Sequence, residues 1–160
     1  MDKHYLEHFF ERTGKLKGYE VANFTLPLTL IYKNMFNETE HLLKTKFNMI
    51  HSELDVLAAL YFNGKVLSPT ELYAATVFSS GGMTKVLKKL EASGLISRVP
   101  CAKDKRSTLV KIEKQGEELV EDSLQEVLQT RKPMFDILSH KEQEDLKKIL
   151  KKLTLHLSDK

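Results

Sequence analysis

Residues 68–112 constrain the fold of this chain most, because they predict two capped helices followed by a charged hairpin. The first helix is expected to begin at residues 68–71, which read Ser-Pro-Thr-Glu. A serine at the N-cap accepts hydrogen bonds from backbone amides, proline suits the first helical position, and the glutamate returns the cap. The second helix is expected to follow residues 79–80 and to end at Gly94, because glycine readily adopts the left-handed conformation that closes a helix.

The second predicted helix has two chemically different faces. One is an apolar stripe at helical spacing, formed by Met83, Val86, Leu87 and Leu90. The other carries small polar groups and lysines: Ser80, Gly81, Thr84, Lys85 and Lys88. This outer face has no acidic residue before Glu91, whereas a helix face meant only for solvent usually mixes acids with its lysines. The sequence therefore predicts a basic outer face without bulky side chains.

A charged hairpin is expected after this helix. Residues 95–99 and 108–112 are short runs rich in β-branched residues, and residues 100–107 between them are polar and contain turn-forming residues. Two helices followed by such a hairpin are typical of a winged helix-turn-helix. We therefore expect a mainly α protein with a small β component, an α+β winged helix.

Two motifs in this stretch resemble those of a known family. Residues 90–98 read L-E-A-S-G-L-I-S-R, and residues 104–107 read D-K-R-S. In order and separation they are similar to the L-E-x-x-G-L-x-x-R junction and the D-x-R-S wing of the MarR family of bacterial transcription regulators. The resemblance covers residues 52–116 in motif and the flanking helices in layout. It departs at Lys85, where arginine is common, and at Glu113, where a capping threonine is frequent.

Further helices are predicted on both sides, at residues 2–12, 25–47, 52–63, 115–131 and from 139 onward. Thr25 and Pro27 mark the expected start of the second of these. Ser52-x-x-Asp55 and Ser139-x-x-Glu142 are expected N-caps, and Pro133 is expected to interrupt the helix before it. The helix after the wing is predicted to turn four apolar residues inward: Leu119, Leu124, Val127 and Leu128.

The terminal helices have apolar stripes that a single winged unit could not cover. In the last helix the stripe consists of Leu146, Ile149, Leu150, Leu153 and Leu157. We expect helices of two copies to interleave in a homodimer, with recognition helices roughly 34 Å apart; the alternative is a monomer whose terminal helices pack on each other. The MarR resemblance implies an obligate dimer. The predicted organisation is N-terminal dimerisation helices (1–50), a DNA-binding lobe (51–114) and C-terminal dimerisation helices (115–160).

The basic charge is concentrated in one part of the chain. The formal net charge is only +3, yet residues 79–114 contain nine Lys and Arg against three acids, a net of +6. The remainder is therefore slightly acidic, at −3. Such clustering is the electrostatic pattern expected for contact with a phosphate backbone. By itself it would more often be a solvated lysine-rich surface, but its coincidence with the helix-turn-helix pattern favours DNA.

These observations predict a sequence-specific DNA-binding transcriptional regulator, a repressor relieved by a small ligand, that binds a pseudo-palindromic operator as a homodimer. Ser68 and Thr70 would hold phosphates, and Thr84 and Lys85 would read base edges in the major groove. Arg106 would enter the minor groove. The predicted DNA-binding residues are Ser68, Thr70, Ser79, Ser80, Gly81, Thr84, Lys85, Lys88, Lys89, Arg98, Lys103, Asp104, Lys105, Arg106 and Ser107. Asp104 is included because it can orient Arg106, although it could equally stabilise the turn.

Other functions fit the sequence less well. A winged module for protein contacts, the main alternative, would need an aromatic or aliphatic anchor on the outer face, and the sequence offers none there. An enzyme is not expected, because the Gly-rich phosphate loop, G-x-S-x-G and H-E-x-x-H motifs are all missing. No cofactor is expected either.

Metal and redox sites are also disfavoured. Glu40, His41 and His51 lack a further close ligand at metal-binding spacing, so they are better interpreted as surface residues. His4 and His8, four residues apart, could bind a metal, but only weakly. Cys101 has cations nearby and could act as a redox sensor, yet it lacks a resolving partner and is more simply an incidental exposed cysteine.

The MarR resemblance implies a crevice for small ligands between the dimerisation helices and the DNA-binding lobe. By layout, Tyr32, Phe36 and His51 are candidate effector-binding residues, with ordinary core packing as the alternative. No apolar run approaches the roughly 20 residues that span a bilayer, so no membrane partner is expected. The N-terminus is not of the secretory kind, and one cysteine does not indicate an oxidising compartment, so a cytoplasmic protein is expected.

Overall fold

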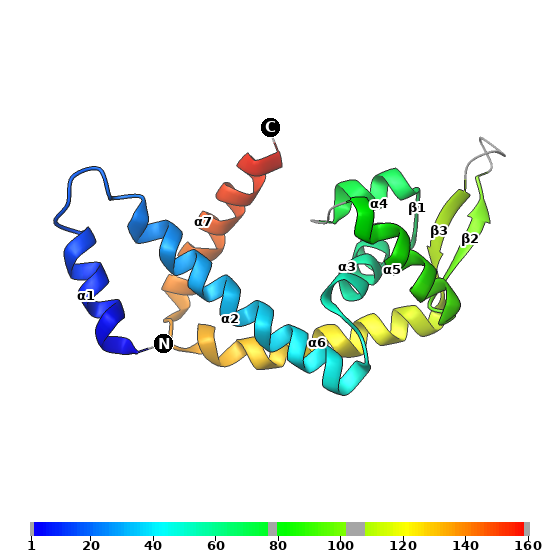
Figure 1. The fold of residues 1–160 in the computed structure, drawn as a ribbon, viewed down its shortest axis with the longest axis horizontal. Coiled ribbons are helices and arrows are strands. Elements are labelled where there is room, and N and C mark those ends of the chain that lie inside the picture. Colours follow the sequence, from blue (N-terminus) through cyan, green and yellow to red (C-terminus); the bar gives the residue numbers. More distant parts are fainter. Residues whose placement is uncertain (1, 77–79, 102–107, 159–160) are drawn as a thin grey trace.

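The chain consists of a winged lobe and a helical arm (Figure 1). A computed structural model describes residues 2–76, 80–101 and 108–158. The lobe comprises α3 (His51–Phe62), β1 (Val66–Leu67), α4 (Pro69–Ala75), α5 (Ser80–Ala92), β2 (Ile96–Pro100) and β3 (Thr108–Ile112). The arm comprises α1 (Lys3–Thr13), α2 (Ala22–Phe47) and α7 (His140–Ser158), and the long helix α6 (Lys114–Asp136) connects it to the lobe. The predicted mainly α winged helix is confirmed.

The sheet has three antiparallel strands in the order β1-β3-β2. The predicted hairpin is present, with Ile96 opposite Ile112 and Pro100 opposite Thr108. Strand β1 was not predicted, because two residues are too few to show an alternating pattern. It forms because the chain reverses after α3 through Gly64 and Lys65, both at positive φ, and the Lys65 carbonyl oxygen then accepts from the Ile112 amide (3.0 Å).

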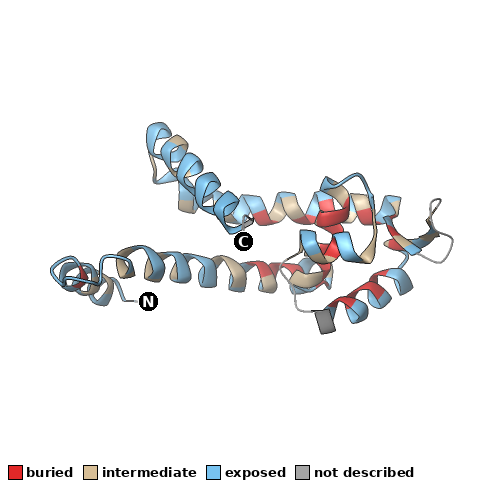
Figure 2. Cartoon of the chain, turned by 90° about the horizontal axis from the view of Figure 1, so that it is seen from above, coloured by how far each residue is buried: buried red, intermediate tan, exposed pale blue. Residues whose placement is uncertain are grey.

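The core lies in the lobe and along the adjoining parts of α2 and α6 (Figure 2). The predicted apolar stripe of α5 is confirmed, since Met83, Val86, Leu87 and Leu90 are all buried. The stripe shares one hydrophobic cluster with residues of α3 and the sheet: Leu54, Val56, Leu57, Leu60, Ile96, Val110 and Ile112. Gly94, at φ +70, ends the α5 segment as predicted. The outer face of α5 is therefore fixed by the burial of its inner face.

Helix α6 corrects two predictions. Its buried residues are Gly116, Val120, Ser123 and Val127, whereas Leu128, predicted to point inward, is 61% exposed. Helical geometry explains this, because spacings of three and four residues keep the buried set on one face and Leu128 lies about 100° away from Val127. Pro133 does not interrupt the helix, which continues to Asp136. Proline removes the hydrogen bond that its amide would donate to the carbonyl four residues earlier and crowds that preceding turn, but the helix nevertheless continues past it.

Helix starts were predicted with mixed success. Ser139 caps α7 as predicted, and its amide donates to Glu142 Oε2 (2.8 Å). The Ser52 cap is wrong: α3 has Ile50 at its N-cap, and the Ile50 amide donates to Glu53 Oε2 (3.1 Å). The start near Thr25 is also wrong, because α2 begins at Ala22 and the Thr25 hydroxyl donates to the Val21 carbonyl oxygen (3.2 Å).

Within the described ranges, no helix combines the length and the apolar character that crossing a membrane requires.

Among the glycines that the structure describes, Gly116 has the least room for a side chain, and its replacement by alanine should destabilise the lobe. A Cβ at this position would overlap the Leu95 carbonyl oxygen and lie 2.9 Å from Ile112 Cγ1. The Leu95 carbonyl cannot retreat freely, because it accepts from the Glu113 amide (3.0 Å). We expect Gly116→Ala to lower the free energy of unfolding by about 1–3 kcal/mol in urea denaturation.

Gly82→Ala is the matched control, since a Cβ there would meet no atom within 4 Å. Gly82 lies in a helix, so alanine should leave stability unchanged or raise it by up to about 1 kcal/mol. Equal urea midpoints for Gly116→Ala and the wild type would contradict the tight packing of α6 against the hairpin.

Candidate nucleic-acid interface

The short helix α4 begins with the predicted capping box. The Glu71 amide donates to Ser68 Oγ (3.2 Å), and the Ser68 amide donates to Glu71 Oε2 (2.7 Å). The hydrogen bond from the Ser68 amide, followed by that from its side chain, holds the pKa of the Glu71 carboxyl below its usual value. The predicted phosphate contacts of this turn are thus unequal, because the Ser68 amide is already engaged whereas Thr70 is exposed.

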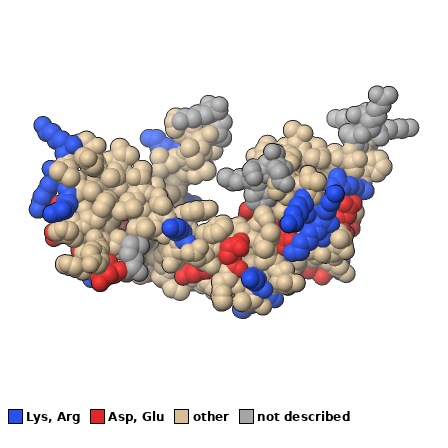
Figure 3. All heavy atoms as spheres, in the orientation of Figure 1, with Lys and Arg blue, Asp and Glu red and all other residues tan. Residues whose placement is uncertain are grey.

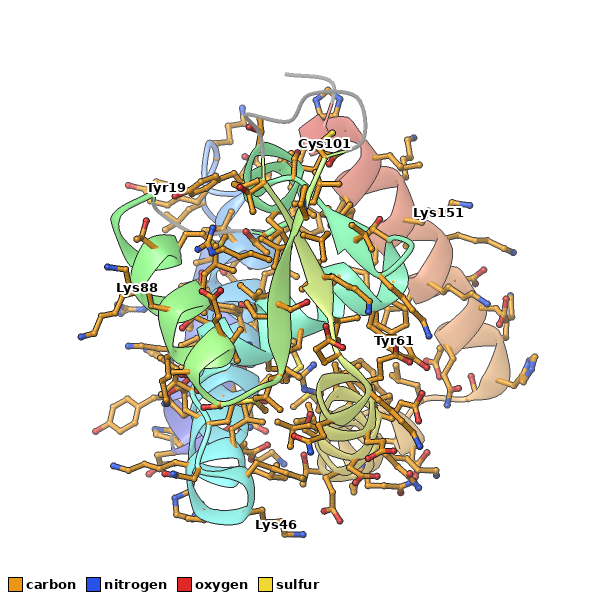
Figure 4. All side chains as sticks on the ribbon, turned by 90° about the vertical axis from the view of Figure 1, so that its right-hand side faces the viewer. Tyr19, Lys46, Tyr61, Lys88, Cys101 and Lys151 are labelled. Carbon is orange, nitrogen blue, oxygen red and sulfur yellow. The ribbon has the colours of Figure 1, made fainter. Side chains whose placement is uncertain are left out.

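The outer face of α5 is basic and accessible. Thr84, Lys85 and Lys88 are exposed on the side opposite the buried stripe. Lys88 points away from the lobe (Figure 4), and Lys and Arg side chains gather over the lobe beside α5 (Figure 3). Among the residues that the structure describes, neither Lys85 nor Lys88 has an ion-pair partner. Two cations and a hydroxyl on one accessible helix face suit contact with a polyanion.

Lys89 differs from these two lysines because its ammonium pairs with a buried carboxylate, although its side chain is 54% exposed. Its Nζ lies 2.6 Å from Glu53 Oε1, and the Glu53 side chain is only 3% exposed. The other oxygen of this carboxylate accepts from the Ile50 amide. Lys89, predicted to contact DNA, therefore joins α5 to the start of α3. No sequence pattern indicated this pairing, because an acid near the start of a helix is usually exposed.

The two described basic residues of the hairpin strands, Arg98 and Lys111, are partly neutralised. Arg98 of β2 lies 3.2 Å from Glu91 at the end of α5, and Lys111 of β3 lies 3.6 Å from Glu113. The Ser97 hydroxyl donates to the Glu113 carboxylate, and this hydrogen bond, aided by Lys111, lowers the pKa of Glu113. Glu91, at the end of α5, thus orients the Arg98 side chain.

Several predicted contacts fall outside the described residues: Ser79, Lys103, Asp104, Lys105, Arg106 and Ser107. Ser80 and Gly81 belong to the first turn of α5. Cys101 is partly exposed and follows β2 directly (Figure 4). The described part of the interface therefore consists of α4, α5 and the two hairpin strands, β2 and β3.

A separate cavity of about 560 Å³ lies between α2 and α3. It brings together the three residues predicted to bind an effector, Tyr32, Phe36 and His51. The rings of Phe36 and His51 stack with centroids 4.7 Å apart, and the ring centroids of Tyr32 and Phe36 are 5.8 Å apart. Sequence reasoning missed two carboxylates of the lining as members of this site. Glu40 was considered only as a metal ligand, and Asp55 only as a helix cap.

The two carboxylates lie on either side of His51. Glu40 Oε1 accepts from the His51 amide (2.7 Å), and Asp55 Oδ1 lies 3.9 Å from His51 Nε2. Burial raises the pKa of Asp55, an effect that His51 opposes and Glu40 reinforces. Across the described ranges, no three His, Cys, Asp or Glu residues are arranged to hold a metal ion; His41 lines a different cavity.

Sequence comparisons relate the chain to known regulators. Residues 47–107 match the model of the MarR family. The chain is 28% identical over 152 residues to the uncharacterized HTH-type transcriptional regulator YdgJ of Bacillus subtilis (strain 168), covering 92% of this chain and 90% of that protein. It is 25% identical over 115 residues to the HTH-type transcriptional regulator PecS of Dickeya dadantii (strain 3937), covering 71% and 69%.

Solved structures share the fold. A MarR family protein from Bacillus stearothermophilus superposes with a TM-score of 0.76 at 20% identity, covering 89% of this chain and 99% of that one. MepR of S. aureus, solved in complex with DNA, gives 0.70 at 22% identity, covering 83% and 97%. NadR, solved with 4-hydroxyphenylacetate, gives 0.67 at 22% identity, covering 81% and 91%. The two motifs, the winged lobe and the sequence matches together make the chain similar to the MarR family of transcriptional regulators.

Proposed function

We propose that the chain binds a pseudo-palindromic operator as a homodimer and represses transcription until a small molecule occupies the cavity between α2 and α3. The observation that carries the DNA-binding part is the outer face of α5. Thr84, Lys85 and Lys88 are exposed there, and the stripe behind them is buried so completely that the helix cannot turn another face outward. MepR, a neighbour in fold, is known as a DNA complex, which supports the same use of this lobe.

The residues would make different contacts with DNA because their side chains differ in reach and chemistry. Thr84 and Lys85 would contact base edges in the major groove, where each base pair shows a distinct pattern of donors and acceptors. Lys88, one turn further along the helix, and Thr70 at the start of α4 would hold phosphates and fix the register. The wing would follow the backbone, with Arg106 in the minor groove and Asp104 orienting it.

The homodimer is supported by apolar side chains of the arm that have no cover within one chain. On α7, Ile149, Leu153 and Leu157 are 56%, 52% and 71% exposed, and on α2, Phe24 and Ile31 are 68% and 42% exposed. Figure 2 shows the outer part of α2 and all of α7 largely exposed. Each square ångström of apolar surface removed from water contributes roughly 25 cal/mol, so covering these helices with a second copy would be strongly favourable.

The small-molecule part rests on the cavity between α2 and α3. Its volume of about 560 Å³ lies within the range usual for small-molecule sites, and it lies at the start of α3, next to Glu53, which binds α5 through Lys89. NadR, another neighbour in fold, holds the small aromatic molecule 4-hydroxyphenylacetate. A ligand that displaces His51 would act on the same turn of α3 that carries Glu53.

Binding to duplex DNA should depend steeply on salt. Each neutralised phosphate contributes about −0.9 to the slope of log K against log salt concentration. With about six to ten phosphate contacts for a dimer, affinity should fall roughly 10³- to 10⁵-fold between 50 and 200 mM salt. Fluorescence anisotropy with an operator selected from genomic fragments measures this slope. A slope near zero on every duplex would leave the protein-contact module as the better interpretation.

Lys88 and Lys89 are adjacent in sequence but should respond differently to alanine. Lys88→Ala should weaken binding to operator and random duplexes by similar factors and leave stability unchanged, since Lys88 is exposed. Lys89→Ala should lower the free energy of unfolding by about 1–3 kcal/mol, because it removes the counterion of the buried Glu53 carboxylate. Lys85→Ala should instead change the preferred sequence if Lys85 reads a base.

Urea denaturation and anisotropy on both duplexes, at one salt concentration, separate these effects. A Lys89→Ala protein with wild-type stability would show that the Glu53 ion pair does not hold α5, and equal preferred sequences for Lys85→Ala and wild type would remove Lys85 as a base reader.

Leu153→Asp in α7 should break the dimer. It places a charge in the apolar stripe formed with Ile149 and Leu157, and burying an unpaired carboxylate is costly. Light scattering should show a monomer or an aggregate, and specific DNA binding should be lost. Lys151→Asp is the control, since Lys151 is exposed on the same helix but outside the stripe (Figure 4). A well-behaved dimer of Leu153→Asp would rule out α7 as the interface.

A further inference from the structure

We propose that the cavity between α2 and α3 takes an organic cation, an amine or quaternary ammonium attached to an aromatic or apolar body. The inference rests on the proposed function, because it assigns the chemical class of the effector to the site that would receive it. It comes from the chemistry of the walls, which combine aromatic rings with carboxylates.

The charge of the lining is entirely acidic. The described residues that form the cavity are Tyr32, Phe36, Glu40, Ile50, His51, Ser52 and Asp55. This set includes two carboxylates and no Lys or Arg, although the chain as a whole is basic, at +3. An anionic ligand would meet two like charges here without a fixed counterion, whereas a cation would meet two opposite ones.

Both carboxylates lie beside His51, and Glu40 is bonded to its amide. Glu40 Oε1 accepts from its amide and lies 3.7 Å from its Nδ1, and Asp55 Oδ1 lies 3.9 Å from its Nε2. Neither ring contact has the length of a hydrogen bond, and Nδ1 is buried without a hydrogen-bond partner among the described residues. The imidazole therefore spaces the two acids without neutralising them when it is uncharged.

The acids are also only partly hydrated, with 37% of the Glu40 side chain and 40% of the Asp55 side chain exposed. Burial is the main reason that the pKa of Asp55 is raised, which means that its surroundings stabilise the ionised form less than water does. A bound cation would stabilise that ionised form. Partial desolvation also strengthens the attraction between a ligand charge and these carboxylates.

The aromatic rings complete the preference for a cation. Phe36 stacks on His51 with an interplanar angle of 10°, and Tyr32 is tilted by 41° against Phe36. The Tyr32 side chain stands at the mouth of the cavity and is 61% exposed. The negative face of a Tyr or Phe ring attracts an ammonium group within about 6 Å. Ile50 adds an apolar wall for the body of the ligand.

Calorimetric titration of the full chain with tetraphenylphosphonium and tetraphenylborate tests the inference, because these ions share one shape and carry opposite charges. We expect tetraphenylphosphonium to bind with a Kd at least about tenfold lower than tetraphenylborate. The double variant E40Q/D55N should weaken tetraphenylphosphonium binding by about tenfold or more. It removes both charges, keeps the side-chain sizes and leaves an oxygen at position 40 that can accept from the His51 amide.

Glu38→Gln is the matched control. Glu38 lies on the same helix as Glu40, is bonded by the Asn34 side chain (3.0 Å) and lies outside this cavity. It should leave the affinity for tetraphenylphosphonium unchanged. Equal affinity for the two ions, binding of neither ion, or an affinity for the cation that E40Q/D55N does not alter would each overturn the inference.

A measurement on the wild-type protein covers the case in which E40Q/D55N fails to fold. Nuclear magnetic resonance should show the largest shifts on adding tetraphenylphosphonium at Phe36 and Ile50. Shifts confined to Met134 and Leu138, which line an apolar groove between α2, α6 and α7, would overturn the assignment. Duplex binding is measured separately, without either ion. Binding to duplex without binding to the cation would overturn this inference alone. Binding to the cation without binding to any duplex would overturn the proposed function alone.

Discussion

The buried carboxylate of Glu53 holds the start of α3 and the helix α5 together. One oxygen accepts from the Ile50 amide and caps α3, while the other lies 2.6 Å from the Lys89 ammonium of α5. A carboxylate that is 3% exposed would be costly without such partners, so the hydrogen bond and the ion pair both stabilise the folded lobe. The ion pair therefore fixes where α5 lies relative to α3, and with it the direction in which Lys85 and Lys88 point.

The same turn of α3 also faces the cavity. His51 and Ser52 line it, and the His51 amide is bonded to Glu40 of α2. A continuous set of bonds thus runs from α2 through the first turn of α3 to α5. A ligand in the cavity and DNA on α5 would act on opposite ends of this set. Under the proposed function, a ligand that displaces His51 would therefore act on a turn of α3 that is bonded to α5 through Glu53 and Lys89.

The arm is built on a different principle from the lobe. The lobe buries its own apolar residues around α3, α5 and the sheet, whereas α7 and the outer part of α2 keep theirs exposed. Helix α6 belongs to both, with Val120 and Val127 buried against the core and Ile137, just beyond its end, 82% exposed. The proposed homodimer would give the arm the cover that one chain lacks, and α6 would connect that interface to the DNA-binding lobe.

The sequence by itself determined the features that arise within a few residues of each other: the caps at Ser68 and Ser139, the end of α5 at Gly94, its buried stripe and the hairpin. It also indicated the grouping of Tyr32, Phe36 and His51, though only through the layout of a similar family. Tertiary structure alone decided the pairing of Lys89 with Glu53 and the place of Asp55 in the cavity. Caps and stripes depend on local backbone geometry and periodicity, which the order of residues specifies directly. Ion pairs and cavity walls depend on helices that meet from distant parts of the chain, and their packing alone determines which acid faces which base.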